Sequence, residues 1–160
     1  MSHPLHGARP VDRTAGYPAA ARLLTADWER IAGSAITAAV ERNPELPARL
    51  GEIGLRHLLR DGEVVLEKLA ESLASGSTSP LRLFTEHATP TWRRRRISMD
   101  DVTDLYEGLR LAVPALIPSD AAPLADAALC DGIAVLRWHR RLGGDRRKRN
   151  RILAALYKGA

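Results

Sequence analysis

Arg60 and Asp61 are the adjacent side chains of this sequence whose chemistry best suits binding of a polar ligand. A guanidinium pairs with carboxylate groups, and a carboxylate accepts hydrogen bonds from N–H groups. The pair directly precedes an apolar run at helical spacing, which ends at Gly76. That run consists of Val65, Leu66, Leu69 and Leu73. Arg60 and Asp61 are therefore expected to be either the polar groups of a crevice or a surface ion pair.

Motifs of metal and catalytic sites are missing from the sequence. It contains no nucleophile elbow, P-loop or glycine-rich dinucleotide motif. The histidines are scattered, and none pairs with another or with the single cysteine, Cys130, at metal-ligand spacing. Asp100 and Asp101 fall in the predicted first turn of a helix, where the helix dipole favours carboxylates. We predict no metal site, no catalytic residues and a non-enzymatic function. The five histidines are His3, His6, His57, His87 and His139.

Basic residues gather in two segments. Residues 93–96 are four arginines, and residues 137–151 hold eight Arg or Lys against Asp145 alone. The net charge of the chain is +5, so the remainder is acidic, at about −6. Such segments suit a solvated helix end, an acidic partner protein or nucleic acid. Because no nucleic-acid-binding motif accompanies them, a partner protein is favoured over nucleic acid. The candidate contact residues are Arg137, Arg140, Arg141, Arg146, Arg147, Lys148, Arg149 and Arg151.

Composition favours one soluble helical domain. Hydrophobic residues make up 45% of the 160 residues but aromatics only 4%, and residues that favour strands are few. No apolar run approaches the ~20 residues of a membrane-spanning helix, and the first residues do not read as a secretory signal. A single cysteine forms no internal disulfide and fits a reducing compartment. We expect a cytoplasmic protein without a membrane segment.

Apolar periodicity predicts an all-α fold of six to eight helices. Residues 1–16 are expected to form a disordered tail, and residues 17–160 a single domain whose basic last helix ends near Lys158. The three tryptophans, Trp28, Trp92 and Trp138, are expected to be buried or half-buried. The predicted helix boundaries are Thr25, Asn43-Pro44, Ser79-Pro80, Thr89-Pro90, a capping box of Ser98 with Asp101, and Ser119-Asp120.

Three stretches resemble the globin superfamily. The helix that opens the phycobiliprotein globin domain resembles RIAGSAITAAVERNP, and its chromophore helix resembles RDGEVVLEKLAESLASGSTSP. Its last two long helices resemble ISMDDVTDLYEGLRLAV and SDAAPLADAALCDGIAVL. A helix start in the non-haem sensor globins of bacterial stressosome-type regulators resembles WRRRRISMDD. The resemblance covers about residues 26–142 and implies a globin-like bundle.

For haem, the resemblance places Arg95 at the position of the iron ligand and Asp61 at the opposite, distal position. Arginine stays protonated and has no lone pair to donate to iron. The resemblance therefore implies that no ordinary haem site exists. His87 lies close in the sequence and would be the alternative iron ligand in a shifted register; otherwise it is an exposed histidine at a helix end.

For a bilin, the resemblance aligns Arg60 and Asp61 with the Arg-Asp pair that contacts the chromophore. The carboxylate would accept hydrogen bonds from pyrrole nitrogens, and the guanidinium would pair with a propionate. Leu58 stands where the attaching cysteine is found, so a bilin would bind without a covalent bond. His57 and Tyr106 complete the candidate crevice.

We therefore expect a bacterial sensory or regulatory domain without a cofactor, in which a ligand or partner signal is transmitted by repacking of helices. A carrier or photoreceptor holding a non-covalent bilin, or a haem, is the first alternative. A basic nucleic-acid-binding module is the second. Sensor globins dimerise through terminal helices, so the resemblance implies a homodimer or a regulatory partner protein.

Overall fold

A computed structural model describes residues 16–143, and this part of the chain is all-α. The described residues form six α-helices and one 3-10 helix, and they include no strand, as the sequence predicts. None of these helices is both long and apolar enough to cross a membrane. The elements are α1 (Pro18–Ala26), α2 (Trp28–Arg42), α3 (Leu46–Ser75), α4 (Ser79–Arg94), α5 (Met99–Ala112), η1 (Val113–Ala115) and α6 (Ala122–Gly143).

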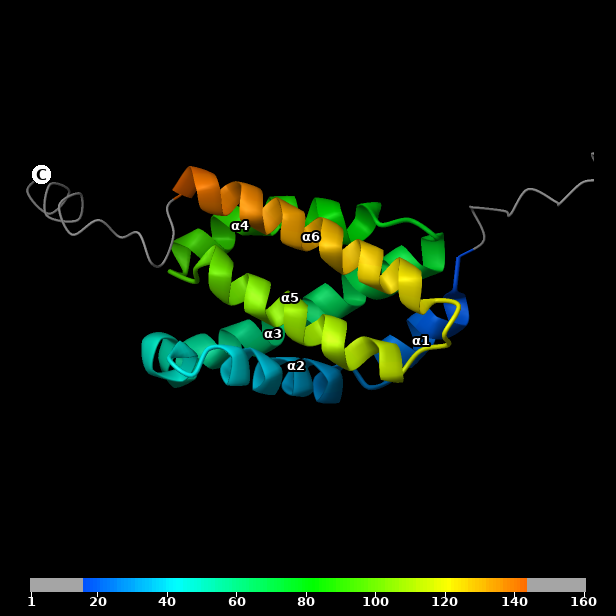
Figure 1. Ribbon diagram of the computed structural model, residues 1–160, viewed down its shortest axis with the longest axis horizontal. Coiled ribbons are helices and arrows are strands. Elements are labelled where there is room, and N and C mark those ends of the chain that lie inside the picture. The colour runs from blue at the N-terminus through cyan, green and yellow to red at the C-terminus, as the bar shows by residue number, and fades with distance from the viewer. Residues whose placement is uncertain (1–15, 144–160) are drawn as a thin grey trace, which may run out of the picture.

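The helices pack around one core, with α5 placed centrally between α2 and α6 (Figure 1). Helix α3 packs against α1, α2 and α4, and α4 packs along α6. Helices α4 and α6 both end at the side of the molecule where α5 begins (Figure 1). The C-terminal turns of α4 and α6 therefore become neighbours, although they are about 45 residues apart in the sequence.

Two helix ends follow directly from local sequence chemistry. Gly76 adopts the left-handed conformation at the end of α3, with φ of 69°, which glycine adopts without steric cost. Ser98 and Asp101 form the predicted capping box at the start of α5. Asp101 N–H donates to Ser98 Oγ at 3.1 Å, and Ser98 N–H donates to the Asp101 carboxylate at 3.4 Å. These two groups satisfy backbone donors that have no partner within the helix.

Two predicted boundaries are wrong, and α6 begins at Ala122 and not at the predicted Ser119-Asp120. Thr25 lies inside α1 and does not cap α2; its hydroxyl donates back to the carbonyl groups of Ala21 and Arg22. Helix α4 continues through Pro90 to Arg94, where the sequence predicts two helices. A proline inside a helix costs about 3 kcal/mol. Burial of Trp92 two residues later, on the face that also carries Thr85, offsets this cost.

Close backbone contact between α2 and α5 depends on a glycine. A Cβ atom added at Gly108 would lie 2.4 Å from the carbonyl oxygen of Ala35, a distance no methyl group tolerates. Small residues at both positions therefore let the two helices approach closely.

Of the three tryptophans, only Trp92 is in the core. Trp92 is 1% exposed, whereas Trp28 is 37% and Trp138 56% exposed. The prediction that Trp138 is buried or half-buried is therefore wrong, because the Trp138 side chain projects from α6 toward solvent. The predicted last helix after Gly143 and all of the predicted tail except Gly16 lie outside the described residues.

Candidate functional site

Asp61 and Arg95, which the globin resemblance places opposite each other, are in direct contact. An Arg95 guanidinium nitrogen donates to Asp61 Oδ1 at 3.1 Å, and Trp92 Nε1–H donates to Asp61 Oδ2 at 3.1 Å. We call these three residues the Asp61 cluster. It links the middle of α3 to the C-terminal turn of α4. Both carboxylate oxygens are thus engaged within the protein.

Burial controls the electrostatics of the Asp61 cluster. The Asp61 side chain is only 15% exposed. Loss of hydration raises the pKa of the Asp61 carboxyl above its ordinary value, although Arg95, Trp92 and the nearby His57 all act in the opposite direction. The desolvation of the carboxylate therefore outweighs its attraction to the guanidinium.

Tyr106 is completely buried and forms a second polar link between helices. Its hydroxyl lies 2.7 Å from the hydroxyl of Thr85 on α4. Burial and the nearby Asp61 carboxylate raise the pKa of Tyr106, so the phenol is neutral in the folded protein. Tyr106 is thus a structural neighbour of the Asp61 cluster.

The other predicted crevice residues do not join the Asp61 cluster, although His57 lies near enough to Asp61 to affect its pKa. Arg60, His57 and His87 are exposed. The predicted surface ion pair between Arg60 and Asp61 is wrong, because the carboxylate turns inward from α3 and its partner is Arg95. His87 on α4 instead lines a groove between α4 and α6.

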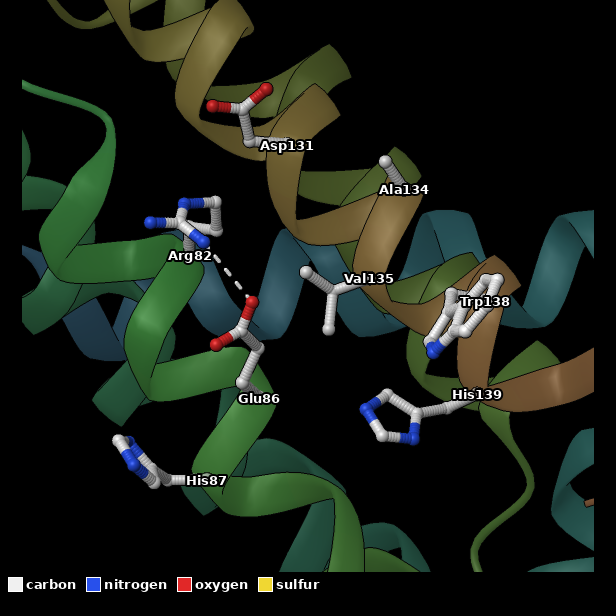
Figure 2. A pocket seen from close by; sticks show the side chains of 8 residues that line it. All are labelled: Arg82, Glu86, His87, Asp131, Ala134, Val135, Trp138 and His139. Carbon is white, nitrogen blue, oxygen red and sulfur yellow. Dashed lines mark hydrogen bonds and ion pairs between the residues drawn. The ribbon is translucent and has the colours of Figure 1, made fainter. Parts of the chain in front are cut away.

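The groove between α4 and α6 has a volume of about 670 Å³. Figure 2 shows His87 and Glu86 on one wall and Val135, Trp138 and His139 on the other. Glu86 accepts a hydrogen bond from Arg82 at 3.1 Å within the same wall. Because His87 and Trp138 are exposed, the groove is open to solvent. Its lining residues are Arg82, Glu86, His87, Asp131, Ala134, Val135, Trp138 and His139.

At one end of this groove the two basic segments meet. Arg93 donates a hydrogen bond from its guanidinium to the backbone carbonyl of His139 at 2.7 Å. Arg141 lies over the Trp138 ring, with its guanidinium carbon 5.6 Å from the ring centroid. Arg137 and Arg140 pair with acidic residues of α5, Glu107 at 3.9 Å and Asp100 at 3.2 Å. The other predicted contact residues lie outside the described part of the chain; they are Arg146, Arg147, Lys148, Arg149 and Arg151.

No family model matches this chain, and no curated protein sequence matches it.

A tetrapyrrole does not fit the residues predicted to hold it in this conformation. The Asp61 oxygens accept hydrogen bonds from Trp92 and Arg95, and Tyr106 is enclosed by protein. Every buried side-chain nitrogen and oxygen within residues 16–143 has a hydrogen-bond partner within the protein. The described residues likewise contain no group of three or more His, Cys, Asp or Glu that could hold a metal ion.

Sequence reasoning missed the polar stripe of α4. Thr85, Thr89 and Trp92 recur at four- and three-residue spacing, which places them on one helix face. That spacing was available from the sequence and would have indicated a buried polar face. The partner residues, Asp61 and Tyr106, come from other helices and only the tertiary packing identifies them.

Proposed function

We propose that this chain is a non-enzymatic regulatory domain with a globin-like helical bundle, which binds no cofactor and responds to a partner by repacking its helices. The observation that supports this most directly is the contact of Asp61 with Arg95 and Trp92. The globin resemblance would place Asp61 and Arg95 facing a chromophore or an iron ion. In this chain their contact instead holds α3 and α4 together. Their polar groups contribute to helix packing, which argues against a ligand at this position.

Helix α4 is the element through which such repacking would spread. It is joined to α3 by the Asp61 cluster and to α5 by the hydroxyl pair of Thr85 and Tyr106. Near its end, Arg93 joins it to α6. A partner that binds one arrangement of α4 better than another shifts the population toward that arrangement. Because hydrogen-bonded packing is discrete, a small displacement of α4 would alter all three contacts.

An absorption spectrum tests the absence of a cofactor. The full chain is purified after co-expression with haem synthesis and, separately, with bilin synthesis. We expect no visible band in either preparation. A visible band that is lost in Asp61→Ala would instead support the tetrapyrrole carrier, because only a ligand contacting that carboxylate depends on it.

Hydrogen–deuterium exchange tests the coupling through α4. In Asp61→Ala we expect faster exchange in α3 and α4 and also in α5 and α6, because the contacts share one helix. The matched control is Arg60→Ala, which removes an exposed side chain one residue away. Faster exchange confined to the turns next to Asp61 would contradict the repacking mechanism.

A further inference from the structure

We propose that the groove between α4 and α6 binds an acidic amphipathic helix of a partner protein. This inference rests on the proposed regulatory function and names the surface at which the partner acts. The groove combines an uncovered apolar stripe with a cationic end, and these two features together define the chemistry of the occupant.

The apolar stripe runs along α6. Val135, Trp138 and Leu142 recur at three- and four-residue spacing on one face of this helix. Trp138 is 56% and Leu142 65% exposed, so much of their apolar surface is in contact with water. Tryptophan is among the residues that contribute most binding energy when a partner covers them. The stripe thus offers an apolar contact surface for a helix.

The cationic end supplies the charge preference. Arg141 stacks on Trp138, and Arg93 reaches the backbone of His139 at the same end of the groove. Carboxylates of a partner helix would pair with these guanidinium groups, since charge-assisted hydrogen bonds are the stronger kind.

The shape of the groove favours a helix over a small molecule. Small-molecule sites bury about 70–90% of their ligand, whereas this groove is bordered by exposed side chains on both walls. An amphipathic helix lying in an open groove needs burial on one face only. Glu86 and Asp131 on the lining disfavour acidic groups along the middle of the groove, so the carboxylates of a partner helix would lie at the cationic end. A phosphate backbone is charged along its whole length and cannot avoid these two carboxylates. The observations therefore favour a protein segment over nucleic acid.

Selection from a random peptide library displayed on phage, with the full chain as bait, tests the proposal. We expect the enriched peptides to be acidic, with apolar residues at i, i+3 or i+4, and i+7. Trp138→Ala should weaken their binding about tenfold or more, as removal of a central tryptophan does at other interfaces. Arg141→Glu should weaken it too, and the effect should shrink as salt rises. The matched control is Trp28→Ala, another exposed tryptophan, which should leave affinity unchanged.

Three results would overturn the docking proposal. One is the absence of enriched peptides, and another is enrichment of basic peptides. The third is equal binding to the chain and to Trp138→Ala, shown to be folded by circular dichroism. A duplex or single-stranded oligonucleotide that displaces the peptides with a steep negative salt slope would assign the basic end to nucleic acid. If a peptide binds the groove but hydrogen–deuterium exchange changes only in α4 and α6, the docking proposal is supported and the repacking mechanism is contradicted.

Discussion

The hydroxyl oxygens of Tyr106 and Thr85 lie 2.7 Å apart in an interior closed to water. Thr85 also donates its single hydroxyl proton to the carbonyl of Leu81 at 2.8 Å, so Tyr106 is the donor in the bond they share. Gly132 of α6 lies against the same ring, where an added Cβ would be 2.4 Å from Tyr106 Cε1. Tyr106 is therefore the point at which α4, α5 and α6 meet.

The direction of this hydrogen bond predicts unequal effects of removing its two partners. Thr85→Val leaves the Tyr106 hydroxyl buried without an acceptor and should lower the free energy of unfolding by about 1–3 kcal/mol. Tyr106→Phe leaves the Thr85 proton bonded to Leu81 and should cost about 0.5–1.5 kcal/mol. The double variant should cost less than the two single variants together, because it also removes the Tyr106 hydroxyl that Thr85→Val alone leaves without an acceptor. Urea unfolding measures all three, and a cost of Tyr106→Phe equal to or larger than that of Thr85→Val would contradict the donor assignment.

Two glycines predict opposite effects of the same substitution. Gly108→Ala should lower the free energy of unfolding by about 1–3 kcal/mol, because its methyl group would meet the Ala35 backbone and force α2 and α5 apart. Gly33→Ala in α2 should raise it by roughly 0.5–1 kcal/mol, since no atom lies within 4 Å and alanine favours the helix. Urea unfolding of the two variants checks the packing directly. Stabilisation of similar size at both positions would indicate that helix propensity, and not close approach, decides.

The start of α5 predicts a graded pair of effects. Ser98→Ala removes one half of the capping box and should cost about 1 kcal/mol. Asp101→Ala should cost more, because the buried Asp101 carboxylate also accepts a hydrogen bond from Arg49 at 2.6 Å, and bonds to charged groups contribute about 1.5–3 kcal/mol. Thermal unfolding of both variants measures the difference. A larger loss for Ser98→Ala would show that the cap, and not the link to α3, is the main role of Asp101.

The sequence predicts the fold best where local chemistry decides. Gly76 and the Ser98–Asp101 box depend only on backbone conformation and on side chains three residues apart, and both predictions are confirmed. Thr89-Pro90 has an equally good local signal for a helix start, yet α4 passes through it. The difference is Trp92, whose burial against the core stabilises the continued helix, and this burial is not visible from neighbouring residues.

The candidate site is harder to predict, because its contacts join distant segments. Arg60 and Asp61 are adjacent in sequence, but their side chains point in different directions, since only that of Asp61 faces inward from α3. The basic segments around Arg93 and His139 read as two independent patches, and the hydrogen bond between them becomes apparent only when α4 and α6 lie side by side. Periodicity indicates which face of a helix is buried, but it does not identify the opposite helix.

The raised pKa of Asp61 predicts how stability changes with pH. Because burial raises the pKa of this carboxyl in the folded state, the folded protein binds the proton more tightly than the unfolded chain does. The contribution of the Asp61 carboxyl to the free energy of unfolding is fully present below its unfolded pKa and is lost as the pH rises through its folded pKa.

Asp61→Asn does not ionise and retains an oxygen that accepts from Trp92 Nε1–H. Its stability relative to the unaltered protein should therefore increase as the pH rises from the unfolded to the folded pKa of Asp61, as measured by urea unfolding. Arg95→Ala should steepen the loss of stability with pH, since Arg95 opposes the upward shift. A relative stability of Asp61→Asn that falls with pH would show that attraction to Arg95 outweighs desolvation.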